Sequence, residues 1–500
     1  MSAIETELNW HDRLTSLNCD TRPLIAGKRF SPQSGEIHER VNPADESKGL
    51  DVPCCNVDEV DIAVRSARRA YETAWRDMPL MQRKMLLSAL AEKLMQNQEE
   101  LALLDSIEIG KPISAALMEV QIASGFFSYY AEAIDKLYGR SAPTDTDALE
   151  LQTHRPRGIV AALTPWNFPV INVALKAAPA LAGGNSLVLK PSEYSVLSAL
   201  RIAELAMEAG FPEGVLNIVT GAGSSGQALV EHQDVNMITF TGSTATGKGI
   251  MRAIGNSAIK PMLLECGGNN PQILFADMLD DDLQGLVMGL VQSAMMNQGQ
   301  VCIARSRLLV ESSVHEQISE AVRNACAGLQ AAHPGLPDTQ FGPLANRIQF
   351  EKVTSLIANA NGGEWLLDGR DAACPKRGYY LGPSVYLDTR GDSSISREEI
   401  FGPVISITPF DNEEQAIKLA NDTECGLAAT VWTRDLSRGH RMPRLLDAGW
   451  VAVNASSKPS MGAGIAHSHE PFGQSGFGVE GGMAGLESYC RLQTTSITHA

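Results

Sequence analysis

The stretch MITFTGSTATGKGIMRAIG, residues 237–255, shows how this chain alternates between strands and helices. Its first six residues form a short apolar run typical of a strand, and residues 244–255 have the spacing of an amphipathic helix. Similar runs precede it at GIVAAL (158–163), SLVLK (186–190) and GVLNIV (214–219), with helices expected near 171–182 and 196–210. This alternation predicts a parallel sheet covered by helices on both faces.

The turn between this strand and this helix is the first candidate binding site. Gly242, Gly247 and Lys248 match the spacing of a phosphate-binding loop, but Gly249 stands where such a loop needs Ser or Thr to hold magnesium. Ser243 and the backbone amides after Gly242 begin a helix, whose dipole and free donors favour a pyrophosphate. The turn is therefore interpreted as a dinucleotide contact and not as an ATPase loop.

A second series of strands and helices follows. Strands are expected at PQILFA (271–276), RLLVES (307–312), VISITPF (404–410), LAATVWT (427–433) and GWVAVN (449–454), with helices near 280–296 and 313–329. We predict two α/β units in series. Residues 57–76 and 81–105 have helical spacing, and residues 141–156 fit neither unit and are expected to form a peripheral hairpin or arm.

Composition narrows the possible classes of function. The 500 residues carry a formal net charge of −17 and no basic run, so a nucleic-acid partner is not expected. No segment approaches the ~18 apolar residues of a membrane helix, and residues 1–19 lack the pattern of a secretory signal. The nine cysteines form no CxxC pair, which argues against a zinc ribbon or a disulfide framework and favours reduced thiols in the cytoplasm.

Three turns carry side chains suited to acyl chemistry. Cys302 lies in NQGQVCIA, a polar turn that is an unusual place for a packed thiol, although most cysteines are inert. Asn167 in TPWNFP either donates to a developing oxyanion or braces its turn. Glu265 in LLECGGNNP ends an apolar strand, either as an ion-pair partner or as a general base with a raised pKa.

A dinucleotide would need further contacts. GAGSSG, residues 221–226, matches a dinucleotide fingerprint, but the acidic residue expected about 20 residues later to bind the ribose is missing. Lys190 and Glu193, placed just past the end of a strand, are the candidate ribose contacts. The alternative interpretation of these two residues is an ordinary ion pair in a solvated loop.

Taken together, TPWNFP, LVLKPSE, FTGST, LLECGGNNP, NQGQVCIA, REEIFGPV and PFGQSGFG resemble the NAD(P)-dependent aldehyde dehydrogenase superfamily. YAEAIDKLYG and VWTRDLSRGHRM look most like its γ-glutamyl-γ-aminobutyraldehyde and betaine-aldehyde dehydrogenase branch. The resemblance implies an α/β fold in a homodimer or homotetramer. Its parts would be a Rossmann-like NAD-binding domain (1–136 and 157–267), an α/β catalytic domain (268–470) and a small β oligomerisation arm (137–156 and 480–500).

The resemblance also implies an enzyme that oxidises an aldehyde to a carboxylic acid with NAD, or more weakly with NADP. Cys302 matches the nucleophile, Asn167 the oxyanion-hole side chain, and Glu265 the base that activates the water that hydrolyses the thioester. Lys176 and Glu480 match a charged pair that relays protons behind this base. The implied cofactor contacts are Thr164, Pro165, Trp166, Lys190, Ser192, Glu193, Gly223, Phe240, Gly242, Ser243, Gly267, Glu399 and Phe401.

The implied substrate tunnel consists of Asn172, Leu175, Met295, Met296, Val301 and Ile303. None is aromatic, so these positions offer no box for a quaternary ammonium group, and a medium-length aliphatic or ω-substituted aldehyde is the predicted substrate. The branch resemblance keeps ω-aminoaldehydes and betaine aldehyde as the alternative. A long loop adds polar groups at Lys458, His467 and His469. No metal is expected, and its two histidines are interpreted as solvated.

Two other classes of function stay open. A CoA-acylating reductase uses the same nucleophile but passes the acyl group to a thiol, and it would not need Glu265. A structural protein that retains the fold without catalysis would not need intact Cys302, Asn167 and Glu265.

Overall fold

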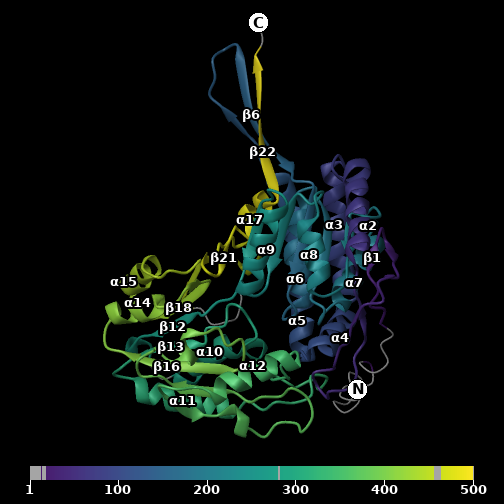
Figure 1. Ribbon diagram of the computed structural model, residues 1–500. Coiled ribbons are helices and arrows are strands. Elements are labelled where there is room, and N and C mark those ends of the chain that lie inside the picture. Colours follow the sequence, from purple (N-terminus) through teal and green to yellow (C-terminus); the bar gives the residue numbers. More distant parts are fainter. Residues whose placement is uncertain (1–12, 14–18, 280–281, 455–462, 499–500) are drawn as a thin grey trace.

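Residues 13, 19–279, 282–454 and 463–498 are described in the computed structural model, which consists of two α/β lobes and a projecting β arm (Figure 1). Lys458 and residues 1–12 and 14–18, which include most of the segment where no secretory signal is expected, lie outside the described residues. Among the described helices, none has the length and apolarity that a membrane crossing requires. The cytoplasmic location stays a prediction.

The larger sheet has eight strands, and the five that follow β1 in the sheet are parallel. Its order is β2 (Lys28–Arg29), β1 (Leu24–Ile25), β9 (Leu216–Ile218), β8 (Ser186–Pro191), β7 (Ile159–Thr164), β10 (Met237–Thr241), β11 (Met262–Glu265) and β21 (Gly476–Phe477). Strands β1, β2 and β21 form antiparallel edges. The four predicted strands of the first unit are therefore confirmed as neighbours in one sheet.

Alternation along β7 divides the core of this lobe into two layers. Val160 and Ala162 pack in one layer, whereas Ile159 and Ala161 pack in the other. The first layer contains α3 (Leu80–Gln96), α4 (Gln98–Ile109), α5 (Ile113–Ala133), α6 (Pro169–Ala182) and α7 (Leu197–Glu208). The second contains α2 (Val57–Ala70), α8 (Gly223–Glu231) and α9 (Thr244–Ser257). Both faces of the sheet are buried, which explains why its strands are continuous apolar runs.

The second lobe surrounds a seven-stranded sheet, parallel except for one edge strand. Its order is β14 (Glu364–Leu367), β15 (Ser384–Leu387), β16 (Val404–Phe410), β13 (Arg307–Glu311), β12 (Pro271–Leu274), β18 (Ala428–Trp432) and β19 (Trp450–Val453). Its helices are α10 (Leu283–Met295), α11 (His315–Ala327), α12 (Arg347–Ala358), α13 (Ser394–Arg397), α14 (Glu413–Asn421) and α15 (Leu436–Arg441). The five strands predicted for this unit are confirmed, and β14 and β15 were not predicted.

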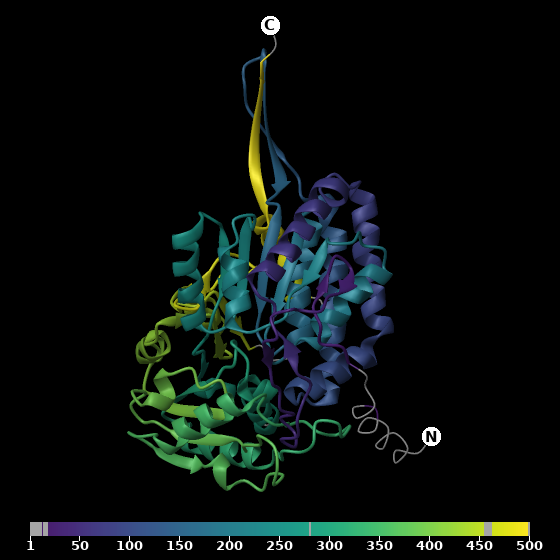
Figure 2. The same cartoon turned by 45° about the vertical axis from the view of Figure 1, so that its right-hand side comes forward.

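The arm is a three-stranded antiparallel sheet made of β5 (Arg140–Ala142), β6 (Ala148–Pro156) and β22 (Cys490–Thr498). It projects from the larger sheet's lobe in both ribbon views (Figures 1 and 2). The hairpin predicted for residues 141–156 is therefore present, and the C-terminal strand completes it. The predicted domain boundaries and the role of the arm in oligomerisation stay predictions.

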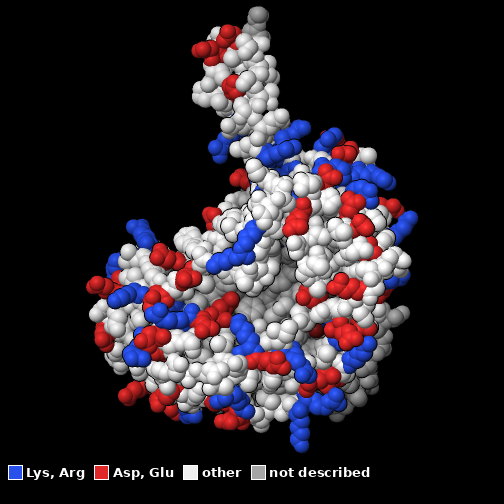
Figure 3. All heavy atoms as spheres, viewed as in Figure 1, with Lys and Arg blue, Asp and Glu red and all other residues white. Residues whose placement is uncertain are grey.

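The shorter elements connect these parts. They are β3 (Ile37–His38), β4 (Val52–Pro53), β17 (Cys425–Gly426), β20 (Phe472–Gly473), α16 (Ala463–Ala466), α17 (Gly482–Ser488), a π-helical turn at Tyr71–Trp75, and 3₁₀ turns at Ile134–Lys136, Ala276–Met278, Met296–Gly299, Gly369–Asp371 and Met442–Arg444. On the face shown in Figure 3, acidic and basic side chains are interspersed, and the surface is hollowed near its centre.

One helix prediction needs correction. The helical spacing over residues 81–105 is divided between α3 and α4 at Asn97, whose backbone leaves the helical region (φ −111°, ψ 24°). The Asn97 side-chain amide donates to the Lys93 carbonyl at 2.8 Å. A local side-chain hydrogen bond of this kind competes with continued helix, which is why the spacing alone did not reveal the break.

Candidate active site

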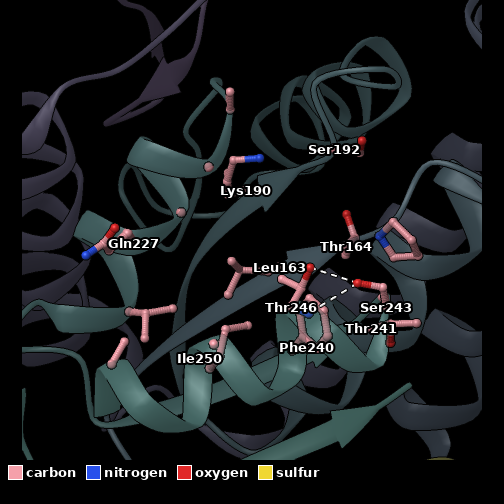
Figure 4. A pocket seen from close by; sticks show the side chains of 18 of the residues that line it. Leu163, Thr164, Lys190, Ser192, Gln227, Phe240, Thr241, Ser243, Thr246 and Ile250 are labelled. Atoms are coloured by element: carbon pink, nitrogen blue, oxygen red, sulfur yellow. Dashed lines mark hydrogen bonds between the residues drawn. The ribbon is translucent and has the colours of Figure 1, made fainter. Parts of the chain in front are cut away.

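A cavity of about 700 Å³ lies at the carboxyl ends of the central strands of the larger sheet. It lies next to β7 and β10, the two strands at which the strand order of the sheet reverses. From β7 the order continues through β8 to β9 on one side, and from β10 it continues to β11 on the other. Ligands of open α/β sheets bind at such a switch point. The cavity is lined by most of the predicted cofactor contacts (Figure 4), namely Thr164, Pro165, Trp166, Lys190, Ser192, Glu193, Gly223, Phe240, Gly242 and Ser243.

The donors around this cavity fit an anionic pyrophosphate. Helix α8 begins at Gly223 after Ala222, whose side chain cannot cap it, so its first amides lack a side-chain acceptor. Ser243 caps α9 by accepting from the Thr246 N–H at 3.2 Å, and its hydroxyl lies 2.9 Å from the Thr246 hydroxyl, where either group can be the donor (Figure 4). The buried Thr241 hydroxyl has no hydrogen-bond partner among the described residues. Unused donors at helix N-termini are the groups that bind phosphate oxygens.

Both candidate ribose contacts line this cavity, and Lys190 lies across it from Ile250 of α9 (Figure 4). Lys190 lies inside β8, which ends at Pro191, so its predicted place beyond the strand is corrected. Its Nζ lies 3.6 Å from Glu193 Oε2 and donates to the Pro191 carbonyl at 3.0 Å. Burial lowers the pKa of Lys190, and Glu193 opposes this effect. The ion pair exists, and both of its members also face the cavity.

A second cavity, of about 440 Å³, adjoins the first. The two share Pro165, Trp166, Thr241, Gly242 and Ser243 in their linings. The predicted nucleophile and oxyanion-hole residue line the second cavity, together with the three remaining predicted cofactor contacts, namely Asn167, Cys302, Gly267, Glu399 and Phe401. The structure therefore brings together the predicted nucleophile, the oxyanion donor and the end of the cofactor site.

Cys302 follows a strained turn. Asn297 and Gln298 adopt left-handed backbone conformations (φ 52° and 57°), which are uncommon for residues other than glycine. The Asn270 side-chain amide donates to the Cys302 carbonyl at 2.8 Å and fixes it. Burial raises the pKa of the Cys302 thiol to about 12, and the nearby Glu265 adds to this effect. The thiol is therefore protonated at neutral pH until a ligand's charge or a base activates it.

Hydrogen bonds fix both the side chain and the backbone carbonyl of Asn167. Its amide donates one proton to the Gln300 carbonyl at 2.9 Å, which leaves the second proton for a ligand. The Asn167 carbonyl accepts from the Asn297 amide at 3.0 Å and from Lys111 Nζ at 2.9 Å. Lys111 is fully buried and pairs with Glu119. This lysine was not predicted, since nothing in its local pattern shows that it reaches Asn167.

Glu265 ends β11 and pairs in register with Thr241 of β10. Burial raises its pKa well above the ordinary value, Glu480 raises it further, and Lys176 opposes the shift. Lys176 Nζ donates to Glu480 Oε1, and both side chains are buried. Lys176 and Glu480 therefore form the predicted charged pair near Glu265, and the role of this pair in relaying protons stays a prediction.

His469 corrects the interpretation of HSHE as a solvated segment. Its Nε2 lies 3.6 Å from Glu265 Oε1, and its ring lines the second cavity. The backbone of His469 pairs with that of Glu480 in both directions, at 2.9 and 3.0 Å, and this pairing draws the ring inward. His467 remains exposed.

Two glycines allow REEIFGPV to approach the turn of Cys302. A Cβ at Gly267 would lie 2.1 Å from Glu399 Oε2, and one at Gly299 would lie 2.0 Å from the Gly402 carbonyl oxygen. No side chain fits at either position without displacing the backbone or the carboxylate. Phe401 follows with φ 58° and lines the second cavity. These close contacts explain why the two motifs share one site.

Five of the six predicted tunnel residues line the second cavity, namely Asn172, Leu175, Met296, Val301 and Ile303. Met295 does not: it is buried in the core of the second lobe, at the end of α10. The chain leaves the helix between Met295 and Met296, so the two neighbouring side chains point to different places.

Two aromatic side chains that the tunnel prediction missed also line this cavity, Phe168 and Trp450. Each already has a cation over its ring. Lys111 Nζ lies 4.0 Å from the Phe168 centroid, and the Arg305 guanidinium lies 4.9 Å from that of Trp450. The cavity is therefore less purely aliphatic than the predicted residues indicate, but its aromatic faces are partly occupied.

Comparison with known proteins identifies the family. The profile of the aldehyde dehydrogenase family matches residues 30–495, almost the whole chain. The chain belongs to the aldehyde dehydrogenase family. It is 41% identical over 496 residues to the NADP/NAD-dependent aldehyde dehydrogenase PuuC of Escherichia coli K12, with 98% of each chain covered.

Solved structures agree with this assignment. The indole-3-acetaldehyde dehydrogenase AldA of P. syringae superposes with a TM-score of 0.95 at 39% identity, covering 99% of each chain. The γ-glutamyl-γ-aminobutyraldehyde dehydrogenase of Burkholderia cenocepacia gives 0.94 at 38% identity, covering 98% of this chain and 99% of its own. The predicted fold, family and branch resemblance are confirmed. This aldehyde dehydrogenase is an NAD(P)-dependent oxidoreductase, and the roles of its individual residues stay predictions.

Proposed function

We propose that this aldehyde dehydrogenase converts an aldehyde to a carboxylic acid through a thioester on Cys302. The observation that carries the proposal is that Cys302 and Asn167 line one cavity, next to the buried carboxyl group of Glu265, and that this cavity adjoins a site fitted to a dinucleotide. NADH formation by the Cys302→Ala variant is the direct test.

The side chains divide the reaction between them. The Cys302 thiol gives up its proton to solvent as its sulfur adds to the carbonyl carbon, and the developing oxyanion accepts from the free amide proton of Asn167. Loss of hydride from the same carbon re-forms the C=O bond and gives the thioester, and NAD, when bound, would supply the hydride acceptor that no side chain offers. Ionised Glu265 then takes a proton from water as the water oxygen adds to the thioester carbon, and the C–S bond breaks to release the acid. In this scheme the CoA-acylating alternative is disfavoured, because Glu265 is present to activate water.

The residues that would hold NAD follow from the first cavity. The pyrophosphate would be bound by the first backbone amides of α8 and α9, together with Thr241 and Ser243. The adenosine ribose would be bound by Lys190 and Glu193. Glu399 lines the second cavity, where it would bind the nicotinamide ribose.

Glu193 is expected to make NAD the preferred cofactor over NADP. Its carboxylate accepts from two ribose hydroxyls and repels a 2′-phosphate, while Lys190, 3.6 Å away, offsets part of the repulsion. Replacing Glu193 with glutamine should lower the NAD/NADP ratio of kcat/KM by about fivefold, which corresponds to ~1 kcal/mol for one partly exposed contact. The exposed Glu213→Gln variant is the control. A wild-type enzyme that is more efficient with NADP would contradict the assignment.

We propose that the arm joins copies of the chain into a dimer or tetramer. Its strands expose Leu492, Ile497 and Leu149, with 64%, 45% and 39% of their surface accessible. Exposed apolar side chains on an extended β arm favour burial against another protein surface. We further propose the predicted domain division (1–136 and 157–267, 268–470, 137–156 and 480–500). The strands of the larger sheet lie within 1–136 and 157–267 except β21, which lies outside all three parts.

The substrate proposal rests on the lining of the second cavity. Most of its described side chains are apolar, and Glu399, at the cofactor end, is the one carboxylate among them. Lys352 lines the same cavity and would repel a substrate ammonium. The partly occupied rings of Phe168 and Trp450 offer little additional cation binding. We therefore propose an aldehyde with an apolar chain, aliphatic or aryl-substituted. The branch relatives keep ω-aminoaldehydes as the second candidate.

Uncharged aldehydes should therefore be the better substrates. We expect kcat/KM for hexanal and phenylacetaldehyde to exceed that for γ-aminobutyraldehyde and betaine aldehyde by at least about tenfold, since an unpaired buried ammonium costs more than ~1.4 kcal/mol. All four are measured on one preparation with saturating NAD. Trp450→Leu is the companion variant, expected to affect phenylacetaldehyde more than hexanal. A higher kcat/KM for betaine aldehyde than for the other three would contradict the proposal and show that the aromatic rings bind cations. A higher kcat/KM for γ-aminobutyraldehyde would support ω-aminoaldehydes as the substrate class.

A further inference from the structure

The imidazole of His469 faces an oxygen that has no other partner. Glu265 Oε1 is buried and has no hydrogen-bond partner among the described residues, and His469 Nε2 lies 3.6 Å from it. Two backbone hydrogen bonds with Glu480, at 2.9 and 3.0 Å, hold His469 in place. A small rotation of either side chain would bring the two atoms within hydrogen-bond distance.

The charged groups around Glu265 differ in their access to solvent. The side chains of Lys176 and Glu480 are 0% and 2% exposed, so both are enclosed behind the carboxyl group. The His469 side chain is 33% exposed and lines the cavity that also contains Cys302. Of these three neighbours, only His469 connects Glu265 with the solvent side of the site.

We propose that His469 accepts the proton that Glu265 takes from the deacylating water and releases it to solvent. This rests on the proposed function, in which Glu265 is the base. After the hydroxide adds and the C–S bond breaks, the O–H proton of Glu265 moves to His469 Nε2. The resulting imidazolium loses its Nδ1 proton to water, and exchange with solvent then moves the remaining ring proton from Nε2 back to Nδ1, so both groups return to their starting states. His469 acts through Glu265 and restores it for the next turnover.

The electrostatic surroundings shift the pKa values of both partners of this transfer. Burial raises the pKa of Glu265 and lowers the pKa of His469, so the two values move toward each other. Glu480 raises the pKa of both groups and Lys176 lowers the pKa of both, while His467 lowers that of His469 further. These shifts make the transfer from Glu265 to His469 less favourable, but they favour the later loss of a proton from the imidazolium to solvent, so the transfer depends on the contact between the two side chains.

The test follows the acyl-enzyme directly. Full-length enzyme is mixed with NAD and limiting hexanal, NADH formation is recorded, and the decay of the acyl group on Cys302 is followed by intact mass. We expect His469→Ala to keep the NADH burst within about twofold of wild type and to slow acyl-enzyme decay by at least about tenfold, less than the ~10²- to 10⁴-fold of a direct acid–base group, because His469 acts through Glu265. Added imidazole should restore most of the decay rate. His467→Ala, an exposed histidine in the same segment, should match wild type.

Each other outcome has a defined meaning. Normal decay in His469→Ala, slow decay that imidazole does not restore, or a burst that falls together with decay would overturn the role of His469. If His469→Ala is unstable by circular dichroism, His469→Gln is measured instead, because its amide cannot accept the proton and the same slow decay is expected. Glu265→Gln separates the two proposals: if its acyl-enzyme decays at the wild-type rate, the assignment of Glu265 as the base fails first.

Discussion

Replacing Cys302 with alanine is expected to lower kcat for aldehyde oxidation by about four to six orders of magnitude, as removal of a covalent nucleophile does in other enzymes. Without the sulfur no thiohemiacetal forms, so no hydride is expelled and no NADH appears. Binding of NAD should be unchanged, because the first cavity is built from other residues, among them Lys190, Gly223 and Ser243. The measurement combines NADH formation with NAD titration by fluorescence.

Two other cysteines make this test specific. Cys266 also lines the second cavity and is the one rival thiol among its described lining residues. Cys374 lies outside that lining, and Cys374→Ala should keep wild-type turnover. Substantial NADH formation by Cys302→Ala, together with its loss in Cys266→Ala, would move the nucleophile to Cys266. The raised pKa of Cys302, about 12, adds a further check: alkylation of the free enzyme should be slow at neutral pH and should accelerate as the pH rises.

Replacing Glu265 with glutamine is expected to preserve the first burst of NADH and to slow steady turnover by about 10²- to 10⁴-fold. Acylation and hydride transfer precede the need for a base toward water, whereas the amide of glutamine cannot deprotonate water. The acyl-enzyme should therefore accumulate and be visible by intact mass. An equal loss of the burst and of the steady rate would place Glu265 in the first half-reaction, as the base for the protonated thiol.

The pH dependence of deacylation distinguishes this role further. The ionised form of Glu265 is the active one, and burial raises its pKa well above the ordinary value. The wild-type deacylation rate should therefore increase as the pH rises through that raised pKa, and it should be low at pH values below that pKa. This pH dependence should disappear in Glu265→Gln. Glu398→Gln, an exposed carboxyl group near the same site, is the control and should keep the wild-type profile. Faster turnover on addition of coenzyme A would instead support the acylating alternative.

Much of the cofactor site can be predicted from local sequence. Ser243 follows an apolar strand and begins a helix, and Glu265 ends the next strand, so both belong to one edge of a parallel sheet. The carboxyl ends of parallel strands meet at that edge whatever the remaining packing. Asn167 and Cys302 are identified by a different route, the family resemblance of their motifs, because polar turns by themselves also occur without catalysis.

The structure was needed wherever a side chain's direction depends on distant packing. Met295 and Met296 are neighbours with the same chemistry, but the end of α10 lies between them, and only Met296 reaches the cavity. Lys111 reaches the Asn167 carbonyl across 56 positions of sequence, and His469 reaches Glu265 because its backbone pairs with Glu480. Spacing reports the period of a helix or strand and the residues at its ends. Contacts between segments far apart in the chain arise from packing, which brings them together only in the folded protein.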